Sequence, residues 1–140
     1  MSRPQQIWMP GGVCTELHLL GEDTDGAFCL MVDHPPAGWE LPAHRHLGEA
    51  ETIHVIEGEF EMQIDGRSLL LHAGETVHVP AGVVHSGRNP GACDGRRLVT
   101  FSPAGIERFF LETGVAGPDV EIDLREALAS ARRHGWEFEA

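Results

Sequence analysis

The chain has 140 residues, enough for one domain with a hydrophobic core that needs no disulfides or structural metal. Hydrophobic residues make up 41% of it and charged residues 23%, which is ordinary globular composition and argues against disorder. The formal net charge of −12 would repel phosphate backbones and anionic lipid headgroups. We therefore expect neither a nucleic-acid partner nor a membrane partner.

Cysteine usage and the first residues favour a reducing compartment. The three cysteines, Cys14, Cys29 and Cys93, form no C-x-x-C pair, so neither a disulfide framework nor a thiolate zinc site is predicted, and we expect reduced, buried thiols. Residues 1–12 lack the basic start and apolar run of a signal peptide, and no stretch approaches the ~20 apolar residues of a membrane span. The sequence thus predicts a cytoplasmic protein.

Residues 13–111 alternate short apolar runs with Gly, Pro, Asn and Asp, a pattern typical of an all-β sandwich or barrel. Asp65 and Gly66 predict a tight hairpin. We expect about nine or ten strands, and the clearest are residues 13–20, 27–33, 41–46, 50–57, 59–64, 68–72, 76–79, 84–88 and 97–101.

The tail changes to a helical pattern. Ser102 and Pro103 resemble an N-cap and first helical residue, and the apolar face that follows stops near Gly114. Asp123 and Glu126 form a second capping signal before a helix that runs to Gly135. We expect one domain over 1–140, with the β core at about 13–101 and a helical tail over 102–140 that covers the sandwich. Phe109, Phe110 and Trp136 are given structural roles in that cover.

A candidate metal site lies on the predicted strand 41–46. His44 and His46 are two residues apart, so on a strand they share a face, with Cα atoms about 6.5–7 Å apart. Glu51 can complete that face after a short turn, and Glu49 in the same turn competes with it. His85 is a fourth candidate, far away in sequence.

These residues belong to two spaced segments, Gly38-x5-His44-x-His46-x4-Glu51-x6-Gly58 and Gly74-x5-Pro80-x-Gly82-x2-His85-x3-Asn89. Together they closely resemble the paired motifs of the cupin superfamily. All ten motif positions are filled, and the spacer of fifteen residues is similar to that of compact bacterial single-domain cupins. The resemblance implies a jelly-roll β-sandwich or barrel, with His44, His46, Glu51 and His85 as the metal ligands. Only Glu51, and not Glu49, matches the family spacing.

Three imidazoles and one carboxylate form a borderline nitrogen and oxygen donor set, suited to one divalent ion of Fe, Mn, Co, Ni, Cu or Zn. A six-coordinate ion would keep positions for water, dioxygen or a bidentate substrate. The resemblance, loosely to quercetin dioxygenase-like cupins, implies a mononuclear dioxygenase acting on a small aromatic or dicarbonyl-like compound. The alternatives are an isomerase or decarboxylase, a non-catalytic small-molecule-binding module and, ranked last, a structural metal. Catalytic residues beyond the ligands are not predicted.

Strand alternation sorts the remaining candidates. We expect a mainly apolar pocket, while His54 and His78 point outward, where they could lie in a homodimer interface. His134 is expected to interact with a helix C-terminal dipole, and Asn89 to bond local backbone groups. The predicted inward positions are Ile53, Val55, Phe60, Met62, Ile64, Val77, Val79 and Phe101. Four arginines are predicted to be surface charges that bind an acidic substrate only if they reach inward: Arg67, Arg88, Arg96 and Arg97.

Overall fold

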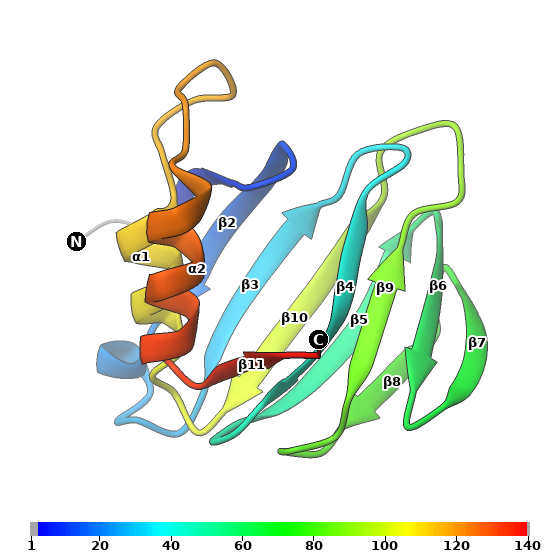
Figure 1. The fold of residues 1–140 in the computed structure, drawn as a ribbon, viewed down its shortest axis with the longest axis horizontal. Helices are drawn as coiled ribbons and strands as arrows, with labels where there is room; N and C mark the ends of the chain where they lie inside the picture. Colours follow the sequence, from blue (N-terminus) through cyan, green and yellow to red (C-terminus); the bar gives the residue numbers. More distant parts are fainter. Residues whose placement is uncertain (1–2, 140) are drawn as a thin grey trace.

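The structure is a computed structural model that describes residues 3–139, and it is a sandwich of two antiparallel β-sheets (Figure 1). The six-stranded sheet has the order β1-β2-β3-β10-β5-β8 and the five-stranded sheet the order β11-β4-β9-β6-β7. The strands of the first sheet are β1 (Gln5–Met9), β2 (Val13–Leu19), β3 (Cys29–His34), β5 (Ala50–Glu57), β8 (Thr76–Val79) and β10 (Arg96–Ser102). Those of the second are β4 (Glu40–His46), β6 (Glu59–Ile64), β7 (Arg67–His72), β9 (His85–Arg88) and β11 (Trp136–Phe138).

The expected jelly-roll β-sandwich is confirmed, and among the described residues the two sheets do not close into a barrel. The predicted hairpin at residues 65–66 joins β6 to β7, with positive φ at both Asp65 and Gly66, as a type I′ turn requires. Two strands were not predicted. β1 pairs with β2 at one edge, and β11 pairs with β4 at the edge of the other sheet.

The core lies between the sheets because inward residues alternate with outward ones along each strand. Every predicted inward position is in or against this core. Ile64 and Val77 are partly buried, and the fully buried members of the predicted set are Ile53, Val55, Phe60, Met62, Val79 and Phe101. This apolar layer holds the two sheets together.

Two short helices follow the β core. α1 (Glu107–Thr113) begins later than the predicted start at Ser102, because Ser102 still pairs with Ala50 as the last residue of β10. α2 (Leu124–Arg133) begins as predicted, since the Asp123 carboxylate accepts hydrogen bonds from two backbone N–H groups. Neither helix has the length and apolar character that a membrane crossing needs, and this holds for the whole described range.

The tail closes one side of the sandwich. In Figure 1 α1 and α2 lie together beside β2, and β11 runs from α2 to the edge strand β4. The ring of Phe109 on α1 meets that of Trp136 on β11, with centroids 5.1 Å apart. The cover predicted for the tail is therefore present in residues 102–139, and its last element is the strand β11.

Candidate metal site and its cavity

Three strands bring the four predicted ligands together. His44 and His46 share the inward face of β4, and His85 on β9 lies opposite His44 in the antiparallel register. Each histidine offers a ring nitrogen, and these atoms all lie within 4.8 Å of one another. Glu51 on β5 faces them from the other sheet, with Oε1 3.0 Å from His85 Nε2 and 3.4 Å from His46 Nε2. All four side chains are buried.

Backbone contacts orient two of the imidazoles. His44 Nδ1 lies 2.7 Å from the carbonyl of Pro42, and His85 Nδ1 lies 3.0 Å from that of Val83. A carbonyl can only accept, so each Nδ1 carries a proton and each Nε2 faces the cluster. His46 has no hydrogen-bond partner at either nitrogen. A buried imidazole without a partner, beside two whose Nε2 atoms face the same cluster, fits a divalent transition metal ion.

The protonation states agree with metal binding. Burial, together with the neighbouring His85, lowers the pKa of His44 to about 4, so this ring is neutral at pH 7. Burial would raise the pKa of Glu51, but the adjacent imidazoles of His46 and His85 outweigh it and hold that pKa well below its usual range. Burial opposes charge on His85, yet its contact with Glu51 raises the pKa of His85 overall. A metal ion would replace the proton that Glu51 and His85 share.

Aromatic side chains from the tail surround the imidazoles. Trp136 stacks on His44, with ring centroids 4.9 Å apart at 22°, and approaches His46 edge-on at 4.5 Å. Phe138 and Phe101 add contacts to His44 and His46 at 5.8 Å and 5.2 Å. The indole Nε1 of Trp136 is buried without a hydrogen-bond partner. These contacts hold the rings of His44 and His46 in place.

The site opens into a cavity of about 520 Å³ between the two sheets. Leu124 and Leu128 of α2 line it although their side chains are 68% and 38% exposed, which places its mouth beside α2. The apolar lining includes Met9, Val13, Met31, Trp39, Leu41, Val99, Phe101, Phe109, Phe110, Trp136 and Phe138. The mainly apolar pocket predicted around a polar centre is confirmed.

The cavity also holds a charged pair that corrects a prediction. Arg97 was expected on the surface, but it is only 7% exposed and lines the cavity. Its Nε and Nη2 donate to the two carboxylate oxygens of Asp33 at 2.9 Å and 2.6 Å. The other three arginines of that set, Arg67, Arg88 and Arg96, are exposed as predicted.

The remaining predicted residues lie outside the cluster. His54 and His78 bond Thr76 and Thr52 on the outer face of the six-stranded sheet. Asn89 bonds backbone groups of residues 35, 91 and 93, as predicted. His134 caps α2 and also lies 3.1 Å from Glu112 of α1.

Glu49 is half-buried near His46 but is not part of the three-histidine cluster. The cysteines are free as predicted, although Cys93 is exposed and only Cys29 is fully buried.

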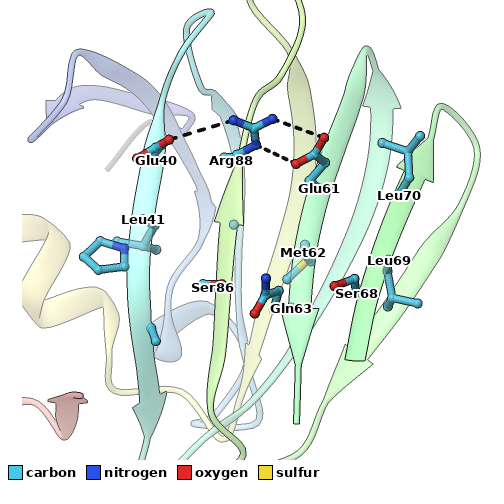
Figure 2. A pocket seen from close by; sticks show the side chains of 13 residues that line it. Glu40, Leu41, Glu61, Met62, Gln63, Ser68, Leu69, Leu70, Ser86 and Arg88 are labelled. Atoms are coloured by element: carbon cyan, nitrogen blue, oxygen red, sulfur yellow. Dashed lines mark hydrogen bonds and ion pairs between the residues drawn. The ribbon is translucent and has the colours of Figure 1, made fainter. Parts of the chain in front are cut away.

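A second hollow, of about 780 Å³, lies on the outer face of the five-stranded sheet (Figure 2). At one end of it Arg88 lies between Glu61, which accepts its Nε–H at 2.5 Å, and Glu40 at 4.0 Å. The hollow is larger than the inner cavity, but the histidine cluster does not line it. The ion pairs in this hollow are exposed, and such pairs contribute little to stability. The inner cavity, which His44 and His46 line, is therefore the candidate site.

Sequence reasoning missed two groups of cavity residues. Arg97 had a usable signal, because the alternation that places Phe101 inward also places Val99 and Arg97 inward. Its partner Asp33 is 64 residues away, and only the β3–β10 pairing reveals it. β11 has three residues, too few for a periodic pattern, so nothing in the sequence signalled that Trp136 would stack on a ligand.

The fold and the site define a β-sandwich protein with a three-histidine cluster between its two sheets. Residues 30–101 match the family model described as Cupin domain, which is more than half of the chain. The chain belongs to the cupin family.

Known proteins similar to this chain include several oxidising enzymes. It is 37% identical over 67 residues to quercetin 2,3-dioxygenase of Bacillus subtilis, covering 48% of this chain and 20% of that protein. It is 29% identical over 123 residues to oxalate oxidase 1 of Hordeum vulgare, covering 80% and 61%. The chain therefore spans between a tenth and about two thirds of the length of the curated relatives it matches.

Two solved structures are similar over most of their length. An RmlC-like cupin from Shewanella frigidimarina is 26% identical with a TM-score of 0.66, covering 75% of this chain and 88% of that one. A predicted oxalate decarboxylase from Thermotoga maritima is 25% identical with a TM-score of 0.64, covering 72% and 92%. Both likenesses agree with the two-sheet architecture.

Proposed function

We propose that the chain is a metal-dependent enzyme of the dioxygenase type, acting on a small aromatic or dicarbonyl-like compound. In this proposal His44, His46, Glu51 and His85 hold one divalent transition metal ion. The observation that carries it is the meeting of three buried imidazoles and a carboxylate at the end of an enclosed, mainly apolar cavity. A structural metal would not need a cavity of this size beside it.

A bound ion would supply Lewis acidity and, if it is iron or copper, one-electron redox chemistry. The protein's own residues supply the rest. Aromatic side chains such as Phe109, Phe110 and Trp136 give flat surfaces for a planar substrate and keep bulk water away from the reacting atoms. Glu51 and His85, 3.0 Å apart, can hold a proton between them when the ligand set rearranges.

Oxygen uptake tests the proposal. Iron-loaded protein is offered flavonols, catechols and diketones in an oxygen-electrode cell, with His85→Ala as the site variant and His78→Ala as the matched surface control. We expect oxygen consumption by the wild type and His78→Ala, and none by His85→Ala. Absence of consumption across all three substrate classes would contradict the dioxygenase assignment.

A second candidate is decarboxylation of a small acid, which the buried Arg97 in the cavity favours. The similarity to a protein described as a predicted oxalate decarboxylase supports it as well. Release of carbon dioxide from an acid without net oxygen uptake would select this reaction over the first.

The proposal also covers the domain organisation, location and oligomeric state of the protein. We treat 1–140 as one domain, because the tail contributes to the same cavity as the β core. The three free cysteines support a cytoplasmic location. A homodimer through the outer face of the six-stranded sheet, where His54 and His78 lie, is tested by light scattering, and a species of 15.3 kDa at every concentration would exclude it.

A further inference from the structure

We infer that the substrate carries a carboxylate or similar planar anion, and that Arg97 binds it at the end of the cavity away from the metal site. This inference deepens the proposed function and depends on its assignment of the cavity as the substrate site. It starts from the Arg97–Asp33 pair, which is buried in the wall of that cavity.

Arg97 has unused hydrogen-bonding capacity. A guanidinium carries five N–H donors, and Asp33 takes one from Nε and one from Nη2. Within residues 3–139 no acceptor bonds Nη1. One Nη1 donor and the second Nη2 donor form the end edge of the guanidinium, the geometry that a carboxylate accepts in a bidentate contact.

Three neighbours hold the guanidinium in place. Asp33 fixes one edge of the plane, while the rings of Trp39 and Phe60 lie 4.9 Å and 5.2 Å from its central carbon. Trp39 and Phe60 in turn meet edge to face at 6.4 Å. A donor fixed in advance loses little conformational entropy on binding, so this arrangement suits recognition.

The pair lies at a suitable distance from the metal site. Arg97, Val99 and Phe101 share the inward face of β10, and Phe101 pairs with Glu51 on β5. Four residues of strand separate the Cα atoms of Arg97 and Phe101 by about 13 Å. A molecule with one ring or a short chain could therefore contact the guanidinium and the metal ligands together.

The charge in the cavity also favours an anion. Among the buried charged groups of the cavity, Arg97 and Asp33 cancel one another, and Glu51 offsets half the charge of a divalent ion. Glu40 also lines the cavity, but its side chain is exposed to solvent. An occupied metal site would thus leave the buried part of the cavity with one net positive charge, inside a chain whose net charge is −12. A monoanionic substrate would neutralise it, and steric enclosure would keep the pair of charges dry.

Stability alone does not account for the pair. Two charges lose their hydration on burial, and apolar residues of similar volume often replace such a pair at no cost in stability. The structure already has a continuous apolar core around this position, with Val55, Met31 and Val99 close to it in the sheet. Retention of a charged pair at the cavity wall therefore agrees with a binding role.

The test compares two probes that differ only at the inferred contact. Protocatechuate and its neutral amide both carry a catechol that can chelate a metal ion, and only protocatechuate places a carboxylate on the opposite side of the ring. Binding to zinc-loaded protein is measured by calorimetry under argon, so that no oxidation occurs. We expect wild-type protein to prefer the carboxylate by at least about tenfold, because charge-assisted hydrogen bonds to arginine are the stronger kind.

The key variant is Asp33→Leu/Arg97→Met, which removes the donor without changing the net charge of the cavity or leaving an unpaired charge. We expect its preference for the carboxylate to fall to within about threefold, with zinc content and melting temperature close to wild type. Arg97→Lys keeps the charge and loses the planar edge, so its preference should also fall. Arg88→Met, which alters only the outer hollow, is the matched control and should keep the full preference.

Equal binding of the two probes by wild-type protein, failure of both to bind, or a preference that survives in the double variant would each overturn the inference. The measurement does not depend on turnover. Carboxylate preference without oxygen uptake would retain the anion site and reject the dioxygenase, whereas oxygen uptake without that preference would do the reverse.

Discussion

Two walls of the same cavity differ in how they are built. The wall of β4, β5 and β9 carries the four candidate ligands at spacings that are visible in the sequence. The wall of α1, α2 and β11 supplies Phe109, Trp136 and Phe138 from a tail with no such spacing. The first wall sets which chemistry is possible, and the second sets the shape, dryness and access of the site.

The largest effect is expected when one of the candidate metal ligands in the first wall is replaced. His85→Ala is expected to lower zinc affinity by more than about 100-fold, because it removes a side chain that binds the metal directly. Even the loss of a residue that only hydrogen-bonds a metal ligand lowers metal affinity by about 10–100-fold. Competition with a fluorescent chelator measures the affinity. His78→Ala, an exposed histidine bonded to Thr52, serves as control. Equal affinities in the two variants would mean that the cluster does not bind metal.

A change in the tail should act mainly on stability. Trp136→Ala removes a buried indole that packs against His44 and Phe109, so we expect a loss of about 3–5 kcal/mol in the free energy of unfolding. Urea denaturation measures it. Leu124→Ala, where the side chain is 68% exposed, should change it by less than about 0.5 kcal/mol. A similar small change for Trp136→Ala would show that β11 does not pack on the cluster.

The pH dependence of the metal-free protein tests the burial of His44. Its pKa is about 4 in the folded state and 6.5 when exposed, so the unfolded chain takes up the proton first as pH falls. The stability associated with the neutral ring is complete above pH 6.5 and is lost between 6.5 and about 4, on the order of 3 kcal/mol.

Denaturation of chelator-treated protein at several pH values measures this loss. The His44→Leu variant should lack that part of the slope, while the exposed His72→Gln variant should keep it. Parallel curves for wild type and His44→Leu would contradict the assigned environment of the ring.

The smallest effect is expected at the contact between the two helices. Hydrogen bonds from Ser130, His134 and Arg133 lower the pKa of Glu112 to about 2. The carboxylate is exposed, so Glu112→Gln should cause only a small drop in melting temperature at pH 7. Because the pKa is lower in the folded state, the difference should shrink as pH falls from 4.5 towards 2. A difference that grows on acidification would reverse the assigned sign.

The two walls also differ in what the sequence could predict. His44, His46 and His85 could be predicted because strand alternation and motif spacing are visible in the sequence itself. Asp33 opposite Arg97 depends on the pairing of distant strands. Trp136 depends on a strand of three residues that forms only against β4, so tertiary contact rather than local preference decides it.

The start of α1 is another feature that tertiary contacts decide and local sequence does not. Ser102 and Pro103 form a plausible helix start, but the β10–β5 ladder extends through Ser102 and delays the helix to Glu107. Glu107 then accepts a hydrogen bond from Gly21, which is 86 residues away, a contact that no local pattern contains. At Asp123 no strand competes, and the capping signal predicts the start of α2 correctly.

The central claim is that the histidine cluster holds one divalent transition metal ion. Elemental mass spectrometry of protein purified without an affinity tag or chelator, alongside His44→Ala, tests it most directly. We predict close to one ion per chain in the wild type, and its loss in the variant. No bound metal in the wild type after reconstitution with iron, manganese, nickel, cobalt, copper and zinc, or equal metal in both proteins, would contradict the claim.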